Sequence, residues 1–304
     1  SYLLDRKQSM NGCAKKRFEN YKQQPLEFVF DKSFTGKLSQ FGLDPDRRTP
    51  SGIKAAIIRE KGTNGEREMA YMLYLAGFDV KDVTMTDLVS GRETLEDINM
   101  VVYCGGFSNS DVLGSAKGWA GSFLFNPKAK AALDNFYARE DTLSLGVCNG
   151  CQLMMELGLI TPEDKKKGKM LHNDSHKFES AFLGVTVPMN RSVMFGSLSG
   201  SKLGIWVAHG EGKFSLPYPE DHYNVVLKYS YDEYPGNPNG SDYSVAGIAS
   251  QDGRHLAMMP HLERACFPWE NAYYPLDRKD SDQITPWMEA FVNARKWVEA
   301  HKKA

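Results

Sequence analysis

The stretch LSLGVCNGCQLMME, residues 143–156, places a cysteine where an apolar run meets a helix-forming run. Its first five residues predict a buried strand, and its second half favours a helix. Gly146 and Gly150 flank Cys148, and small residues on both sides of a nucleophile are what a strained strand-to-helix turn requires. Backbone N–H groups at a helix N-terminus favour a reactive thiolate. The stretch predicts a nucleophile at Cys148, although a small buried core cysteine fits the same pattern.

His261 and Glu263 follow the apolar run HLAMMP late in the chain. In extended backbone, positions i and i+2 share a face, so we expect the Glu263 carboxylate to hold the His261 imidazole by one hydrogen bond. A cysteine nucleophile needs such a base, and the base needs an orienting group. The pattern also fits a His261 that caps a strand end and a Glu263 that forms a solvated charge pair with Arg264.

A glycine pair ends another apolar run, INMVVYCGG, and Phe107 follows it. Thiolate attack on an amide places negative charge on the carbonyl oxygen, which backbone N–H groups beside glycines can stabilise. We expect the donors of this oxyanion hole to be the N–H of Gly106 or of Phe107 together with the N–H of Asn149. A tight turn that needs glycine only for its dihedral angles is the alternative.

Two other enzyme chemistries share parts of this pattern. Cys148 and Cys151 have the spacing of a redox pair, but a thioredoxin-like motif follows the first strand of its fold, whereas several strand-helix units precede Cys148. An α/β-hydrolase or a cysteine peptidase would use the same turn, but a hydrolase places its acid before its histidine. No second ligand pair has the spacing of a zinc site, so no metal is expected.

The elements that position these residues alternate between strand and helix patterns in the first half of the chain. The predicted strands are 53–60, 78–85 and 98–106, and the predicted helices are 64–78 and 129–140. Such alternation predicts a parallel sheet with helices on both faces. In such a sheet the chemistry lies at the carboxyl ends of the strands, where the glycine pair and Cys148 fall.

Beyond residue 180 the pattern changes to short strands separated by turns rich in Gly, Pro and Asn. These predict antiparallel strands added to the sheet edge, and residues 285–300 predict a closing amphipathic helix. The expected fold class is therefore α/β, with a mostly parallel sheet flanked by helices and with added antiparallel strands.

Composition bounds the possible partners. The chain has 304 residues, with 37 basic and 38 acidic side chains. Near-neutral charge without a long basic run argues against a nucleic-acid or membrane partner, and no apolar run has membrane-spanning length. Five irregularly spaced cysteines fit reduced thiols. We therefore expect a cytoplasmic location.

Residues 1–50 differ from the rest, because they are rich in Lys, Gln and Asn and end in a Pro- and Gly-containing stretch typical of a linker that runs over a surface. The opening has the look of a fragment of a longer protein. We expect 1–50 to be a linker or extension from an upstream portion, and 51–304 to be one domain.

Five motifs occur in a fixed order along the chain: GGFS, GVCNGCQLM, HNDSHKFES, WVAHGEGKF and MMPHLER. From Ile53 to Trp269 the chain resembles the class I (triad) glutamine amidotransferase domains of the phosphoribosylformylglycinamidine synthase family. The resemblance implies a flavodoxin-like fold and a glutaminase that hydrolyses L-glutamine through a Cys thioester. The ammonia would pass to an ATP-dependent synthetase site that converts formylglycinamide ribonucleotide (FGAR) to formylglycinamidine ribonucleotide (FGAM) in de novo purine biosynthesis.

The resemblance also implies partners and residue roles. The synthetase domain would belong to the same longer polypeptide and would bind ATP and Mg²⁺, so this chain needs no cofactor of its own. Cys148 matches the nucleophile, His261 the acid/base, Glu263 its orienting group and Gln152 a position that lines the glutamine pocket. Further positions match motifs near the substrate: Gly105, Asn173, Ser175, Phe178, His209 and Glu211. A catalytically silent scaffold with the same fold is the alternative.

The Glu211 carboxylate would accept the substrate's α-ammonium group, although a turn charge between two glycines fits the same residue. The chain departs from the family pattern at three places. Leu262 stands where Pro is expected, Asn109-Ser110 where Tyr-Gly is usual, and Lys117 where an acidic residue is usual. Loss of the Pro lowers the rigidity of the strand end but removes no reacting group.

Overall fold

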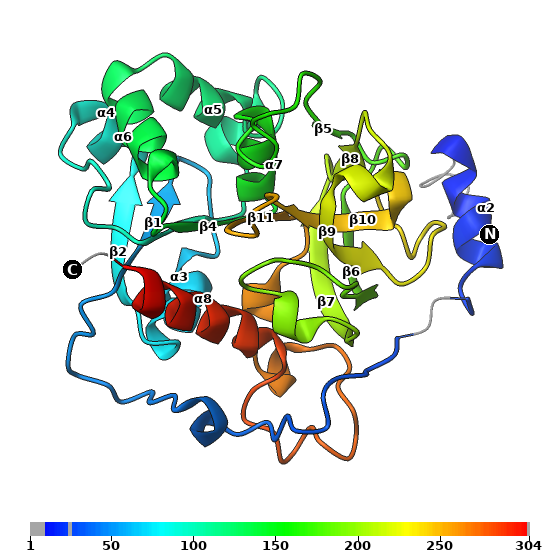
Figure 1. Ribbon diagram of the computed structural model, residues 1–304. Helices are drawn as coiled ribbons and strands as arrows, with labels where there is room; N and C mark the ends of the chain where they lie inside the picture. The colour runs from blue at the N-terminus through cyan, green and yellow to red at the C-terminus, as the bar shows by residue number, and fades with distance from the viewer. Residues whose placement is uncertain (1–9, 24–25, 303–304) are drawn as a thin grey trace.

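The computed structural model describes residues 10–23 and 26–302, and its centre is a nine-stranded sheet (Figure 1). In sheet order the strands are β2 (Asp79–Thr84), β1 (Lys54–Arg59), β3 (Met100–Tyr103), β4 (Leu143–Val147), β11 (His255–Met258), β10 (Val245–Ala249), β9 (Asn224–Tyr229), β6 (Glu179–Thr186) and β7 (Lys202–His209). A separate antiparallel pair consists of β5 (Lys169–Leu171) and β8 (Lys213–Ser215).

The sheet has a parallel half and an antiparallel half. β2, β1, β3, β4 and β11 run parallel to their neighbours, whereas β10, β9, β6 and β7 pair antiparallel. Every residue of β3 and β4 is buried, as expected for central parallel strands covered on both faces. The predicted fold class is confirmed. β11, which comes after all of the antiparallel strands in the chain, returns to the middle of the sheet and pairs with β4.

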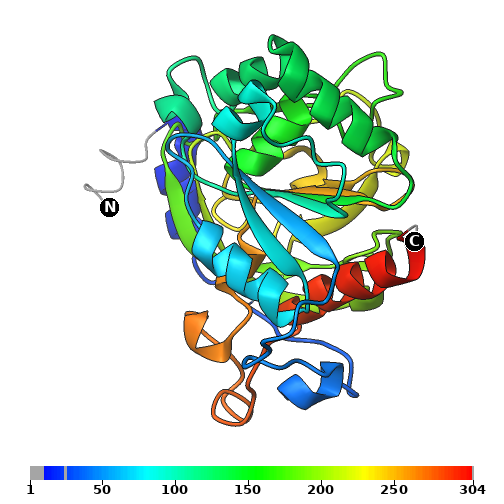
Figure 2. The ribbon, with the colours of Figure 1, turned by 90° about the vertical axis from the view of Figure 1, so that its left-hand side faces the viewer.

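Helices cover both faces of the parallel half (Figures 1 and 2). The helices are α2 (Cys13–Glu19), α3 (Glu66–Leu75), α4 (Met85–Ser90), α5 (Lys117–Leu124), α6 (Pro127–Ala138), α7 (Asn149–Glu156) and α8 (Trp287–His301). α4, α5, α6 and α7 lie on one face, and α3 and α8 lie on the other (Figure 1). Apolar side chains of each large helix point into the core, such as Trp119 in α5 and Trp287 in α8, which are both buried.

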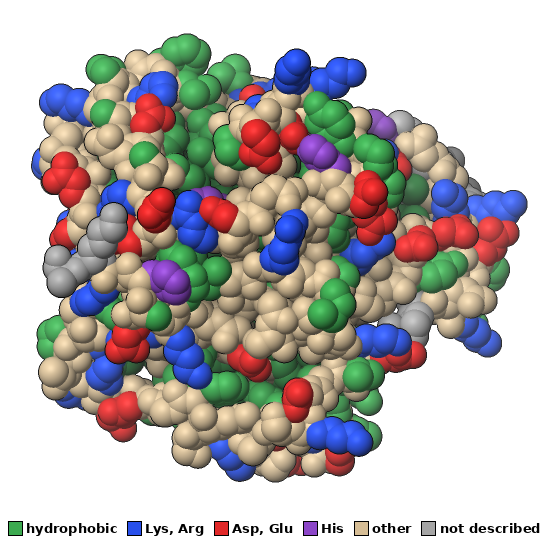
Figure 3. Space-filling view, viewed as in Figure 1, with side chains coloured by type: hydrophobic (Ala, Val, Ile, Leu, Met, Phe, Trp, Pro, Cys, Tyr) green, Lys and Arg blue, Asp and Glu red, His purple; other side chains and the backbone are tan. Residues whose placement is uncertain are grey.

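Short 3₁₀ turns connect these elements. They are η1 (Met10–Gly12), η2 (Leu38–Phe41), η3 (Ser108–Asp111), η4 (Gly196–Leu198), η5 (Glu220–His222), η6 (Asp242–Ser244), η7 (Leu262–Arg264) and η8 (Pro268–Glu270). Within 10–23 and 26–302, no helix combines the length and apolar character needed to cross a bilayer. Basic and acidic side chains are interspersed over the face shown in Figure 3, without a large patch of either sign.

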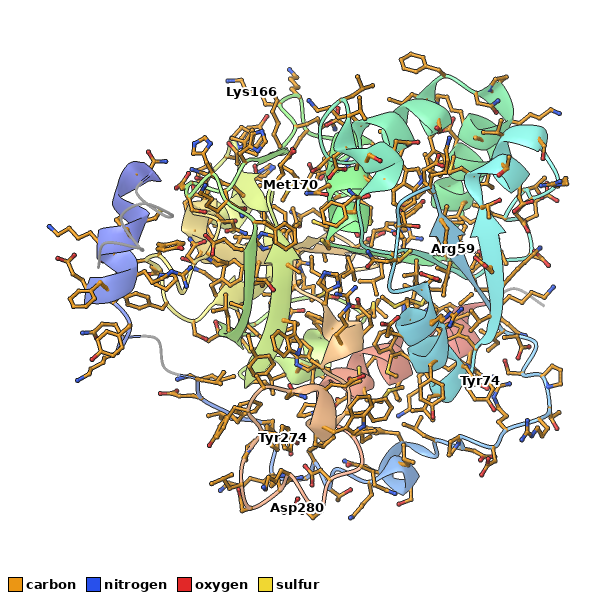
Figure 4. The ribbon with its side chains drawn as sticks, turned by 180° about the vertical axis from the view of Figure 1, so that it is seen from behind. Arg59, Tyr74, Lys166, Met170, Tyr274 and Asp280 are labelled. Carbon is orange, nitrogen blue, oxygen red and sulfur yellow. The ribbon has the colours of Figure 1, made fainter. Side chains whose placement is uncertain are left out.

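The segment before β1 packs along the domain. Val29 exchanges backbone hydrogen bonds with Lys202 at the edge strand β7, with N···O distances of 2.8 and 2.7 Å. Phe34 is buried, and the Arg47 guanidinium pairs with Asp79 at 3.0 Å. Tyr74 of α3, labelled in Figure 4, donates to the Arg47 carbonyl at the same surface. The function of 1–50 as a linker stays a prediction, and residues 1–9 and 24–25 lie outside the described residues.

The predicted strand-to-helix turn joins β4 to α7. Cys148 adopts φ 53° and ψ −107°, a left-handed conformation that L-residues rarely adopt. The glycines on either side permit a close backbone crossing. A Cβ atom on Gly146 would lie 2.5 Å from the Gly150 carbonyl oxygen, and a Cβ atom on Gly150 would lie 2.0 Å from the Tyr103 carbonyl oxygen. Only glycine at both positions lets α7 begin directly against β3 and β4.

Gly150→Ala is therefore expected to destabilise the protein by about 3 kcal/mol or more, because the added methyl group would overlap the backbone of β3. An exposed helical glycine would show the opposite sign, since Ala favours helix by up to about 1 kcal/mol. Urea unfolding measures the difference.

Gly196→Ala is the matched control, because the nearest atom to its added Cβ would be 4.0 Å away. If the two variants lose the same unfolding free energy, the close crossing of α7 over β3 is not what demands glycine.

Candidate active site

Cys148 lies at the carboxyl end of β4 and precedes the first residue of α7. Its backbone N–H donates to the Met258 carbonyl of β11 at 2.9 Å, and its Sγ lies 3.6 Å from the Ala208 carbonyl oxygen of β7. The side chain is 5 % exposed. The first N–H groups of a helix have no partner within the helix, so the start of α7 presents free donors beside this sulfur.

His261 reaches the same place from the neighbouring parallel strand. It follows β11, and its N–H donates to the Trp206 carbonyl of β7 at 2.9 Å. Its Nδ1 lies 2.7 Å from Glu263 Oε1, and both side chains are almost fully buried. The expected contact is present, but the expected extended backbone is not. Glu263 lies within η7, so a 3₁₀ turn, and not a shared strand face, brings the carboxylate to the imidazole.

The electrostatics of this pair favour a protonated imidazole. Burial alone would lower the pKa of His261, but the Glu263 carboxylate and a hydrogen bond with the Cys148 side chain outweigh burial and raise it to about 9. The structure thus places a thiol, an imidazole and a carboxylate in one connected row. This is the arrangement that activates a cysteine nucleophile.

The turn after β3 lies against both Cys148 and His261. A Cβ atom on Gly105 would lie 2.8 Å from His261 Cε1 and 3.4 Å from Cys148 Cβ, so Gly105 contacts both groups through its backbone. Of the two alternatives for the first oxyanion donor, Phe107 is wrong, because its N–H donates to the Gly62 carbonyl at 2.9 Å. Gly106 has φ 121°, and no hydrogen bond from its N–H is found among the described residues.

A cavity of about 430 Å³ opens beside α7. Two of its lining residues were expected at the substrate, Gln152 and Glu211. The Gln152 amide accepts from Asn149 Nδ2 at 2.9 Å and donates to the Glu211 carbonyl at 2.8 Å, so it links the start of α7 to the turn that carries Glu211. Met170 of β5, labelled in Figure 4, lines another side.

The family of the chain follows from its match to known sequences. The model of the CobB/CobQ-like glutamine amidotransferase domain matches residues 52–298. The chain belongs to this family. The resemblance that the five motifs carry is thereby confirmed, and the fold is that of a glutamine amidotransferase domain.

Relatives and solved structures agree with this assignment. A probable phosphoribosylformylglycinamidine synthase of Arabidopsis thaliana is 40 % identical, over 99 % of this chain and 22 % of its own length. The human phosphoribosylformylglycinamidine synthase is 44 % identical, over 83 % of this chain and 21 % of its own length. The chain thus spans about a fifth of these relatives. The structure of PurLQS from Thermotoga maritima has a TM-score of 0.59 and 26 % identity, covering 82 % of this chain and 98 % of that one.

The other positions expected at the substrate of this amidotransferase domain are not among the residues that line this cavity. Asn173 donates to the carbonyls of Lys177 and His209 and accepts from the Gly212 N–H, so it ties two segments together. The Ser175 hydroxyl accepts from the Lys177 N–H. Both residues are fully buried.

Phe178 and His209 flank the site in different ways. The Phe178 ring is half exposed and lies 5.9 Å from the Phe107 ring, measured between centroids. His209 is 2 % exposed, and burial together with the neighbouring His261 lowers the pKa of His209 to about 4. His209 is therefore a neutral imidazole beside a protonated one.

The departures from the family pattern lie in three different surroundings. Asn109 and Ser110 both adopt a left-handed backbone, with φ 52° and 57°, so Ser110 holds a conformation that suits the usual Gly better. Leu262 is fully buried and starts η7. The Lys117 side chain lines the cavity that Glu211 also lines.

Sequence reasoning did not point to several other residues around the cavity and the turn after β3. Asp111, Ser115 and His172 line the cavity, and the Ser115 N–H donates to Glu211 Oε2 at 3.3 Å. Asn64 contacts the turn after β3 from the loop that follows β1. None of these belongs to a spacing pattern with Cys148 or His261, so only the three-dimensional structure identifies them. No group of three His, Cys, Asp or Glu that could hold a metal occurs among the described residues.

Glu263→Gln is expected to lower the pKa of His261 by at least about one unit, because the neutral amide removes the charge that favours the imidazolium. Because the pKa of His261 is higher in the folded state than in the unfolded chain, its protonation stabilises the protein below about pH 6.5, and this stabilisation is lost as pH rises through about 9. The parent should therefore be more stable than Glu263→Gln, and the difference in unfolding free energy should be larger at pH 7 than at pH 10.

NMR titration of the histidine rings measures the pKa, and urea unfolding at the two pH values measures the stability. Glu93→Gln is the control, because Glu93 is also buried and pairs with Lys81 away from the site. A His261 pKa that is equal in the parent and in Glu263→Gln would contradict the charge coupling.

Proposed function

We propose that this chain is the glutaminase part of a phosphoribosylformylglycinamidine synthase. The observation that carries the proposal is the buried row of Cys148, His261 and Glu263 at one edge of the sheet. The names of the relatives support the choice of this synthase among amidotransferases. The silent scaffold is not favoured, because the thiol, imidazole and carboxylate are all present and in contact.

In the proposed reaction the Cys148 thiolate attacks the side-chain amide carbon of glutamine. The N–H groups of Gly106 and Asn149 stabilise the oxyanion. Removal of one donor of this kind typically lowers the rate about 10²–10³-fold. Protonated His261 gives its proton to the departing nitrogen, the C–N bond breaks, and ammonia leaves a γ-glutamyl thioester on Cys148. Water that gives a proton to neutral His261 then attacks the thioester, and glutamate and the free thiol are released.

The cavity beside α7 suits a free amino acid. Glu211 brings an anion and Lys117 brings a cation to its lining. A substrate with an α-ammonium and an α-carboxylate needs one of each. We place the ammonium at Glu211, whose Oε2 is oriented by the Ser115 N–H, and the carboxylate towards Lys117.

The ammonia partner lies outside this chain. The relatives are about five times longer, which supports a synthetase portion on the same polypeptide. That portion would bind ATP, Mg²⁺ and FGAR and would convert FGAR to FGAM with the ammonia released here. A dry passage would keep the ammonia unprotonated on its way. The expectation of a cytoplasmic location and of no nucleic-acid or membrane partner remains part of this proposal.

Cys148→Ala is expected to abolish glutamate release from glutamine, because no thioester forms without the sulfur. Glutamate is measured with the chain alone and with the synthetase portion supplied with ATP and FGAR, which should increase release. Cys151→Ala is the matched control: this thiol is fully buried, and burial raises its pKa well above the usual value, so it should retain the parental rate. No glutamate from the parent under either condition would overturn the glutaminase assignment.

Glu211→Gln is expected to raise KM for glutamine about tenfold or more while kcat changes little, because a contact to the α-ammonium is present in both the ground state and the transition state. Glu156→Gln is the control, since Glu156 lines the same cavity at the far end of α7. A larger effect of Glu156→Gln would place the ammonium at that residue instead.

A further inference from the structure

Glu263 has a second charged neighbour besides His261. Arg264 Nε lies 3.5 Å from Glu263 Oε1, and its side chain is 32 % exposed, whereas that of Glu263 is 2 % exposed. The guanidinium therefore closes the buried carboxylate from the solvent side. This pair is not a solvated surface pair, because one partner is almost completely removed from water.

The same guanidinium reaches the opposite half of the site. Arg264 Nη2 donates to Asn64 Oδ1 at 2.9 Å. The backbone N–H of Asn64 donates to the Gly105 carbonyl at 2.9 Å, and the Gly62 carbonyl accepts the N–H of Phe107 at 2.9 Å. The loop 62–64 is thus bonded to both sides of Gly106, the residue assigned to the oxyanion.

The surroundings leave this bridge little freedom. A Cβ atom on Gly65 would lie 3.2 Å from Arg264 Nη2 and 3.5 Å from Glu263 Oε1. Gly65 has φ 82° and precedes α3, so the N-terminus of a ten-residue helix lies against the carboxylate. A Cβ atom on Gly106 would lie 2.6 Å from Thr63 Cα, so the loop 62–64 also packs tightly on residues 105–107 after β3. We call these three residues, which include the oxyanion donor, the oxyanion strand.

We propose that Arg264 is a positioning residue that couples the Glu263 carboxylate to the oxyanion strand through Asn64. The guanidinium forms an ion pair with Glu263 through Nε and a hydrogen bond to Asn64 through Nη2, which fixes the separation between the nucleophile's base and the donor at Gly106. The inference rests on the proposed glutaminase reaction, in which the thiolate and the oxyanion donors act on one carbonyl group. A misplacement of about 1 Å in such a site can cost about 10²-fold in rate.

Arg264→Ala is expected to lower kcat for glutamate release about 10- to 100-fold and to change KM less than about twofold, since the glutamine cavity is untouched. Arg264→Lys should recover little, because an ammonium cannot contact both partners as the fork does. Asn64→Ala should also lower kcat, and the double variant should be no worse than Arg264→Ala alone, because both act through one bridge. Arg92→Ala is the control, as Arg92 pairs with Asp87 on α4 and is well exposed.

The alkylation rate of Cys148 by iodoacetamide, followed by mass spectrometry, reports on the thiol and its base without any need for glutamine. It should fall about threefold or more in Arg264→Ala. It should stay parental in Asn64→Ala, because Arg264 keeps its ion pair with Glu263 in that variant. Protection of the other four buried cysteines shows that each variant is folded.

The outcomes separate the two proposals. Glutamate release and alkylation that are both parental in Arg264→Ala would overturn the positioning role, as would multiplicative losses in the double variant. A parent that releases no glutamate would overturn the glutaminase assignment. The alkylation rates of Cys148 would then still test whether Arg264 positions Glu263 and the base.

Discussion

Three adjacent parallel strands end at one edge of the sheet, and the site depends on this arrangement. β3 delivers Gly105, β4 delivers Cys148, and β11 delivers His261. Neighbouring parallel strands lie about 4.8 Å apart, so the turns that follow them are forced together without any long side chain having to span the gap. The antiparallel half then supplies the remaining wall, because β7 contacts Cys148 and His261 through the carbonyls of Ala208 and Trp206.

Much of this could be predicted from local pattern. The buried run before Cys148 and its flanking glycines specify a strand, a turn and a helix, since each of these depends on residues close in sequence. The partnership of Cys148 and His261 followed from the family motifs. The position of β11 could not be predicted, because its apolar run does not indicate which strand it pairs with. The change of composition near residue 50 also marks no packing boundary, since Phe34 is buried against the domain.

The interpretations that differ from the structure share one physical cause. Phe107 stands beside the glycine pair, but its N–H is already bonded to Gly62, a residue 45 positions earlier in the chain. Glu263 contacts His261 through a 3₁₀ turn that Ala265 closes with its N–H on Leu262. A buried backbone N–H group must donate a hydrogen bond to some acceptor, and the sequence does not show which acceptor that is. For this reason the sequence alone did not show whether the N–H of Gly106 or that of Phe107 is left free as an oxyanion donor.

A buried carboxylate and imidazole are costly to hold in the charged state, and removal of either partner would leave a charge without compensation. Here the cost is reduced locally, because Glu263 faces the start of α3 on one side and Arg264 on the other. His209 completes this pattern, since its own burial keeps it neutral and so adds no second positive charge beside His261. The protonated state of His261 is thus set by its two partners, because the Glu263 carboxylate and the Cys148 side chain raise its pKa to about 9 against the effect of burial. The start of α3 and the Arg264 guanidinium act on the other partner, since both lie beside the Glu263 carboxylate.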